Sequence, residues 1–127
     1  MAPLRILLVD DSAEFLESAA RFLATSDDLT LVGATDSGYS ALDQATALKP
    51  DLVLIDLAMP GMNGLEATRL LKERAEAPRV VIMTLYDNAE YRTAAYDAAA
   101  DGFISKSAIR TQLFPMIASI FARPMPV

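Results

Sequence analysis

Three carboxylates stand where apolar runs of the sequence end. Asp10 and Asp11 follow Leu4–Val9, and Asp56 follows Leu52–Ile55. Such aliphatic runs, bounded by turn residues, are typical of strands buried on both faces. If these two strands are neighbours, the acids meet in a small volume, where like charges ~4 Å apart repel by ~4 kcal/mol at an effective dielectric near 20. Because the chain has no Cys and no His, we predict an all-oxygen site for Mg²⁺, with Mn²⁺ as the alternative.

Two further side chains at strand ends suggest chemistry on a phosphoryl group. The hydroxyl of Thr84 ends one apolar run, and Lys106 directly follows another. An ammonium and a hydroxyl both donate hydrogen bonds to phosphate oxygens. Since carboxylates act as covalent nucleophiles for phosphoryl groups, we expect Asp56 to accept a phosphoryl group while a metal neutralises charge during in-line attack.

Each of these residues also has an ordinary structural explanation. The acid pair is explained by a turn and a helix cap, and Asp56 by a solvated loop. Thr84 is explained by a bond to nearby backbone, and Lys106 by a surface charge. Their order at successive strand ends nevertheless favours the functional interpretation, because ligands bind beyond the carboxyl ends of parallel strands.

Strand-like and helix-like patterns alternate along the chain. The expected strands are Leu4–Val9, Leu29–Ala34, Leu52–Ile55, Val80–Thr84 and Gly102–Ser105. Apolar residues with one-face helical spacing follow each strand, the later helices covering Leu65–Ala75, Asn88–Ala100 and Ala108–Ala122. Pro115 in the last segment predicts a kink or a later helix start. The alternation predicts an α/β fold with a parallel, doubly wound sheet and helices on both faces.

The bulk composition limits the classes of protein. A chain of 127 residues is expected to form one domain with its own core. A formal net charge of −6 makes this domain a poor candidate for binding nucleic acid by itself. No signal peptide and no membrane-spanning apolar stretch are recognised, so a cytoplasmic protein is expected. We predict a domain over residues 1–122 and, from Pro124 and Pro126, the start of a linker or tail over 123–127.

At these residues the chain resembles the receiver domain of bacterial two-component response regulators. The resemblance covers nearly the whole length and is carried by Asp10 and Asp11 after LRILLV, Asp56 within LVLIDLAMPGMNG, Thr84 within VVIMT and Lys106 within DGFISK. The segment MTLYDNAEYRTAAYDAAADGFISKSA is most similar to receivers of the NarL/FixJ type. The resemblance implies a flavodoxin-like (βα)5 fold with a five-stranded sheet in the order 2-1-3-4-5.

The resemblance also implies a role for each site residue. Asp56 would be the phospho-acceptor. Asp11, Asp56 and the backbone carbonyl of Ala58 would ligate Mg²⁺, with Asp10 helping through a water molecule. Thr84 and Lys106 would contact the phosphoryl group.

Phe103 takes the place of an aromatic residue that couples the receiver site to the face of the fourth helix, fifth strand and fifth helix. Its alternative explanation is a half-buried strand aromatic. A histidine kinase is the implied phosphoryl donor, and the implied outputs are homodimerisation or control of an attached domain. Contact with DNA would need an output domain absent from this chain. No membrane partner and no turnover of an external substrate are implied.

The sequence departs from the family pattern at several positions. Leu85 stands where a small residue is common, which could crowd Thr84 or Phe103. Ser107 stands where a proline after a cis peptide is common; a non-proline cis bond costs roughly 2.5–4 kcal/mol, so a differently built loop is expected. Ala58 and Tyr86 flank the site where family members vary, which leaves the phosphoryl lifetime open.

Three other classes of protein compete with a phosphorylation switch. A magnesium-dependent phosphohydrolase would need a second acid two positions after the nucleophile, where Ala58 stands. A flavodoxin-like cofactor binder would need a phosphate loop where Asp10 and Asp11 stand. A pseudo-receiver that only binds partners is compatible with Leu85 and Ser107.

Overall fold

The computed structural model describes residues 2–124, and within them strands and helices alternate as predicted. The strands are β1 (Leu4–Val9), β2 (Leu29–Thr35), β3 (Leu52–Asp56), β4 (Arg79–Thr84) and β5 (Gly102–Ser105). The α-helices are α1 (Ala13–Leu23), α2 (Gly38–Leu48), α3 (Gly64–Lys72), α4 (Ala89–Asp97) and α5 (Ile109–Phe121). The predicted linker or tail, residues 123–127, lies only partly within this range, because 125–127 fall outside the described residues.

The five strands form one parallel sheet in the order β2-β1-β3-β4-β5. This order confirms the predicted flavodoxin-like arrangement. The chain moves outward from β1 to β2, then returns to β3 on the other side of β1, where the register pairs Val9 with Ile55. The carboxyl ends of β1 and β3 are therefore neighbours at the point where the strand order reverses.

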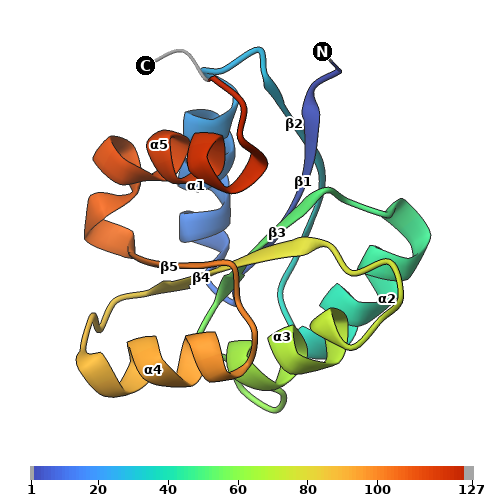
Figure 1. Ribbon diagram of the computed structural model, residues 1–127, viewed down its shortest axis with the longest axis vertical. Coiled ribbons are helices and arrows are strands. Elements are labelled where there is room, and N and C mark those ends of the chain that lie inside the picture. Colours follow the sequence, from blue (N-terminus) through green and yellow to red (C-terminus); the bar gives the residue numbers. More distant parts are fainter. Residues whose placement is uncertain (1, 125–127) are drawn as a thin grey trace.

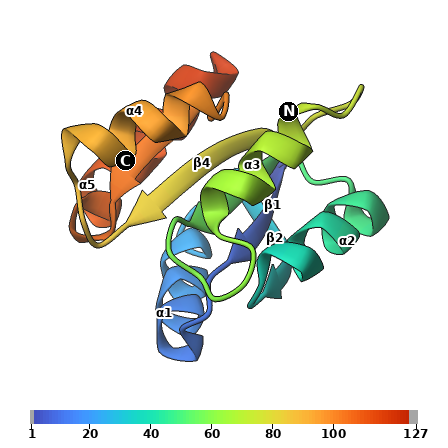
Figure 2. The ribbon, with the colours of Figure 1, turned by 90° about the horizontal axis from the view of Figure 1, so that it is seen from below.

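Helices cover both faces of the sheet (Figure 1). Helices α1 and α5 lie on one face, where Phe22 and Phe114 stack with ring centroids 4.6 Å apart. Helices α2, α3 and α4 lie on the other face, with α3 between the other two (Figure 2). Each face has its own apolar core, and every residue of β3 is buried between them. Burial on both faces explains why β3 reads as a continuous apolar run.

Two helices end well before their predicted bounds. Helix α3 ends at Lys72 and α4 ends at Asp97, both three residues earlier than the sequence indicates. After α4, Ala99 takes a left-handed conformation with φ 69°, which turns the chain into β5 although alanine favours a helix. Helix α5 is a single element that contains the exposed Pro115, so the alternative of a later helix start is wrong.

Asp101 links several elements at the end of the sheet where the strands begin. Its carboxylate accepts hydrogen bonds from Lys72 Nζ at 2.9 Å and from the Val80 N–H at 2.8 Å, and it pairs with the Arg79 guanidinium at 3.3 Å. These contacts join the end of α3 to the starts of β4 and β5. Far from the acids of the other edge, this ion-pair cluster is structural.

No helix in the described part of the chain is both long and apolar enough to cross a membrane.

Candidate functional site

A cavity of about 180 Å³ opens at the carboxyl ends of β1, β3, β4 and β5. Its lining residues come from four loops and comprise Asp10, Asp11, Ser12, Asp56, Ala58, Thr84, Leu85, Tyr86 and Lys106. Every predicted site residue except Phe103 lies in this lining. Segments far apart in the sequence are thus brought together by the parallel topology alone.

The three acids form a compact cluster in this cavity. One carboxylate oxygen from each of Asp10, Asp11 and Asp56 lies within 4.8 Å of the other two. Asp10 is fully buried and Asp56 nearly so, whereas Asp11 is exposed. The Ser12 N–H donates to Asp10 Oδ1 at 2.8 Å, which orients that carboxylate at the start of α1. A set of oxygen donors with one open side suits a hard divalent cation such as Mg²⁺.

Lys106 supplies the positive charge of the cluster. Its Nζ lies 2.5 Å from Asp10 Oδ2 and 3.4 Å from Asp56 Oδ1, and it sits 4.2 Å from the centroid of the Phe15 ring. One ammonium among three carboxylates leaves net negative charge in the cavity. This excess charge is the electrostatic reason for a cation to bind there.

Burial raises the pKa of Asp56 from 3.8 to about 6, and the negative charge of Asp10 adds to the rise. The Lys106 ammonium opposes this effect and lowers the pKa. At neutral pH the carboxylate is therefore mainly ionised, although its charge is disfavoured relative to water. An ionised, poorly solvated carboxylate is suited to act as a nucleophile.

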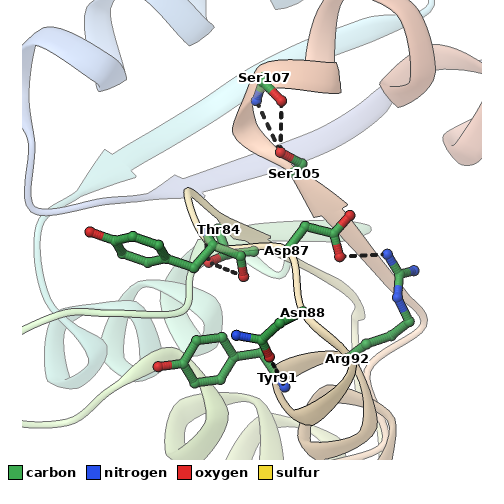
Figure 3. Close-up of polar contacts among 8 residues, drawn as sticks. Thr84, Asp87, Asn88, Tyr91, Arg92, Ser105 and Ser107 are labelled. Carbon is green, nitrogen blue, oxygen red and sulfur yellow. Dashed lines mark hydrogen bonds and ion pairs between the residues drawn. The ribbon is translucent and has the colours of Figure 1, made fainter.

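A serine pair holds the loop that carries Lys106. Residues 106–108 form a 3₁₀ turn, and the Ser107 N–H donates to Ser105 Oγ at 3.3 Å. The two hydroxyls are 2.8 Å apart (Figure 3). None of the peptide bonds described for residues 2–124 is cis, so the turn starts with an ordinary trans peptide after Lys106. The serine at position 107 thus takes part in building the turn.

Thr84 faces the cavity but its hydroxyl is engaged with the loop that follows β4. Its Oγ1 accepts a hydrogen bond from the Tyr86 N–H at 2.9 Å and donates to the Tyr86 carbonyl at 3.3 Å. Leu85 is 70% exposed, so its side chain does not crowd the buried Thr84 in this conformation.

Gly64 allows the loop after β3 to pass close to the site. A Cβ at this position would lie 2.2 Å from the carbonyl oxygen of Asp56, and the Gly64 N–H donates to the Leu57 carbonyl at 2.9 Å. Asn63 caps α3 by accepting from the Glu66 N–H at 2.9 Å. This close approach of α3 to β3 places Ala58 at the rim of the cavity.

Phe103 lies apart from the cavity. It is only 2% exposed and packs in the core beneath α4, so it is a strand aromatic as the alternative explanation has it, but fully rather than half buried. The Arg92 guanidinium lies 4.9 Å from its ring centroid.

Sequence reasoning missed two residues that support the site, Ser12 as a donor to Asp10 and Phe15 beneath Lys106. It also missed Arg92, which lies over Phe103 outside the cavity. Only Ser12 has a sequence signal, because a serine directly before a helix-like segment is a typical helix cap. The two cation–π contacts depend on side-chain positions that no sequence pattern encodes.

The strand order, the cavity at its reversal point and the acid cluster define a doubly wound α/β domain with a charged site at the carboxyl ends of its strands. A family model described as response regulator receiver domain matches residues 6–118, and the chain belongs to this family. As a receiver domain of a response regulator it serves phosphorylation-dependent signalling in a two-component system.

Individual relatives agree with this assignment. The chain is 39% identical over 119 residues to the response regulator GacA of Pseudomonas viridiflava, covering 94% of this chain and 56% of that protein. It is 36% identical over 104 residues to the nitrate/nitrite response regulator protein NarL of Escherichia coli K12, covering 82% and 48%. The chain therefore spans about half the length of the curated relatives it matches.

A solved structure of a two-component response regulator of the LuxR family from Aurantimonas sp. SI85-9A1 superposes with a TM-score of 0.88. The two chains are 28% identical, and the match covers 96% of this chain and 88% of the other. The predicted resemblance to NarL-type receivers is confirmed.

Proposed function

We propose that this receiver domain accepts a phosphoryl group on Asp56 from a histidine kinase, in a reaction that requires Mg²⁺. The observation that supports this most is the meeting of three carboxylates, Lys106 and Thr84 in one cavity. Asp11, Asp56 and the carbonyl of Ala58 would hold the cation, and Asp10 would help through a water molecule. When bound by these residues, Mg²⁺ would supply positive charge that offsets the charge of the phosphoryl oxygens.

The side chains of the site divide the remaining work. An Asp56 oxygen attacks phosphorus while the bond from phosphorus to the donor imidazole nitrogen breaks, and the electron pair leaves with the imidazole. Lys106, already beside Asp10 and Asp56, turns its ammonium toward a phosphoryl oxygen. The Thr84 hydroxyl redirects its proton from the weak 3.3 Å bond with Tyr86 to another phosphoryl oxygen.

Intact mass spectrometry after incubation with acetyl phosphate tests this assignment. We expect the parent protein to gain the mass of one phosphoryl group with Mg²⁺ and to gain none with a chelator. Asp56→Asn should gain none under either condition. Modification of Asp56→Asn to the same extent as the parent would disprove the role of Asp56.

The remaining features belong to the same proposal. The folded receiver would cover residues 1–122, with a linker or tail over 123–127. Phosphorylation would control homodimerisation or an attached DNA-binding domain, and Phe103 would couple the site to that output. We place the protein in the cytoplasm and propose that it does not turn over an external substrate.

A further inference from the structure

Arg92 contacts both the loop after β4 and the side chain of Phe103 in β5. Its guanidinium pairs with Asp87 Oδ1 at 2.7 Å in the loop after β4 and covers the Phe103 ring of β5 at 4.9 Å. Figure 3 shows Arg92 reaching back from the first turn of α4 to Asp87. Phe103 is almost completely buried. Because the Arg92 guanidinium lies over its ring, that side chain helps to shield the ring from solvent.

The position of Arg92 is unfavourable for a cation without such partners. Asn88 caps α4, and its side chain accepts from the Tyr91 N–H at 2.8 Å, so Arg92 lies at the end of the first helical turn. A positive charge near a helix N-terminus opposes the helix dipole. Asp87, which directly precedes the cap, offsets that cost and fixes the direction of the guanidinium.

The same loop holds the hydroxyl that faces the cavity. Tyr86, next to Asp87, donates its N–H to Thr84 Oγ1 at 2.9 Å. A hydroxyl accepts at its lone pairs and has one proton to donate. With the Tyr86 N–H on a lone pair, the proton of Thr84 is held by the weaker 3.3 Å contact and can turn to a ligand.

We propose that Arg92 is a positioning residue: with Asp87 and the Phe103 ring it forms a latch that holds the loop after β4 in place and so presents the Thr84 hydroxyl to the phosphoryl group. The latch rests on the proposed function and adds a regulatory element to it. The order of contacts runs from Phe103 through Arg92 and Asp87 to the Tyr86 backbone and Thr84. It connects the aromatic side chain of β5 to the cavity without passing through Asp10, Asp11 or Asp56.

The test is calorimetric titration of the protein with Mg²⁺ alone and then with beryllofluoride in saturating Mg²⁺. Arg92→Ala and Asp87→Asn should each weaken beryllofluoride binding by roughly threefold to tenfold, the range expected for one exposed ion pair and one cation–π contact. The double variant should lose no more than either single variant. Mg²⁺ affinity should stay unchanged, a split between the two ligands that general destabilisation would not produce.

The signs of these effects separate the latch from long-range charge. Beryllofluoride is an anion, so charge alone predicts weaker binding for Arg92→Ala but tighter binding for Asp87→Asn. The latch predicts weaker binding for both. Glu90→Gln is the matched control, because it removes a negative charge from the same turn of α4 and Glu90 makes no ion pair within residues 2–124.

Two results would overturn the latch alone: parent-like beryllofluoride affinity in Arg92→Ala, or an undiminished effect of Arg92→Ala in a Thr84→Ala background. In that background we expect no effect, since the hydroxyl through which Arg92 acts is gone. A parent protein that binds no beryllofluoride at Asp56 would instead overturn the proposed function together with the latch.

Discussion

The Asp56 carboxylate is buried next to another carboxylate, and its pKa of about 6 links the site to the stability of the metal-free protein. In the unfolded chain the same group has its ordinary pKa of 3.8. Between these two values the folded protein holds a proton that the unfolded chain has lost. The free energy of unfolding therefore falls as the pH rises from about 4 to about 6, and above that pH the full penalty is present.

Replacing Asp56 should remove this penalty. Without metal, we expect Asp56→Asn to be more stable than the parent above pH 6, by up to roughly 3 kcal/mol for a pKa raised this far. The difference should shrink toward pH 4, where the parent carboxyl is protonated in the folded state. Urea unfolding in a chelator across this pH range measures it. A variant less stable than the parent at neutral pH would contradict the pKa.

Thr68 gives a second prediction at the scale of one residue. Within residues 2–124, its Oγ1 is the buried side-chain polar atom that lacks a hydrogen-bond partner. An unsatisfied buried hydroxyl costs about 1–3 kcal/mol, so the nearly isosteric Thr68→Val should stabilise the protein by about 1 kcal/mol in thermal or urea unfolding. Thr35→Val is the control and should destabilise, because the Thr35 hydroxyl bonds to Ser40 Oγ at 2.5 Å. A loss of stability in Thr68→Val would show that the hydroxyl has a partner.

The elements were predictable to different degrees. The predicted bounds of β1 and β5 match the structure, because their aliphatic runs stop abruptly at polar residues. The end of α4 was not predictable, since Ala98, Ala99 and Ala100 favour a helix while the chain has to turn into β5. Local propensity is weaker than this tertiary requirement.

The meeting of these polar residues in one cavity was predictable, because they stand at strand ends and parallel topology brings such ends together. The engagement of Thr84 with Tyr86 and the contact between Arg92 and Phe103 were not. Both depend on how the loop after β4 is arranged in space, which no periodic pattern of residue types describes.

The packing of α3 against the end of β3 gives a prediction at the scale of elements. Gly64→Ala should lower the free energy of unfolding by more than 3 kcal/mol or abolish Mg²⁺ binding, because its Cβ would overlap the Asp56 carbonyl and backbone there has little room to relax. Urea unfolding and calorimetry measure the two effects.

Gly61→Ala separates this clash from a simple loss of glycine. Gly61 has φ +73°, but a Cβ there would make only an ordinary van der Waals contact with Tyr39 at 3.5 Å. A cost of only about 1–2 kcal/mol is therefore expected, the usual penalty for a left-handed residue with a side chain. Equal effects of the two substitutions would show that the close approach of α3 to β3 is not required.

At the scale of the whole molecule, one sheet with a core on each face couples the site to global stability. A ligand that binds only the folded state adds RT ln(1 + [L]/Kd), about 2.7 kcal/mol at a hundredfold excess over Kd. Saturating Mg²⁺ should therefore raise the midpoint of urea unfolding for the parent. The gain should be much smaller for Asp56→Asn, which lacks one ligand. Shifts of the same size in both proteins, produced equally by Ca²⁺ or by a monovalent salt, would instead indicate general screening of charge.

The two rims of the sheet are built in opposite ways. Asp101 fastens three elements where the strands start, whereas residues 85–88 at the acid-lined rim form a loop outside any helix or strand. Amide hydrogen exchange should thus be slow at Val80 and fast at Leu85, Asp87 and Asn88, whereas the Tyr86 N–H is protected by its bond to Thr84. Any rearrangement on phosphorylation would then move the loops at the carboxyl ends of the strands, while the opposite ends of the strands, held by Asp101, would stay fixed.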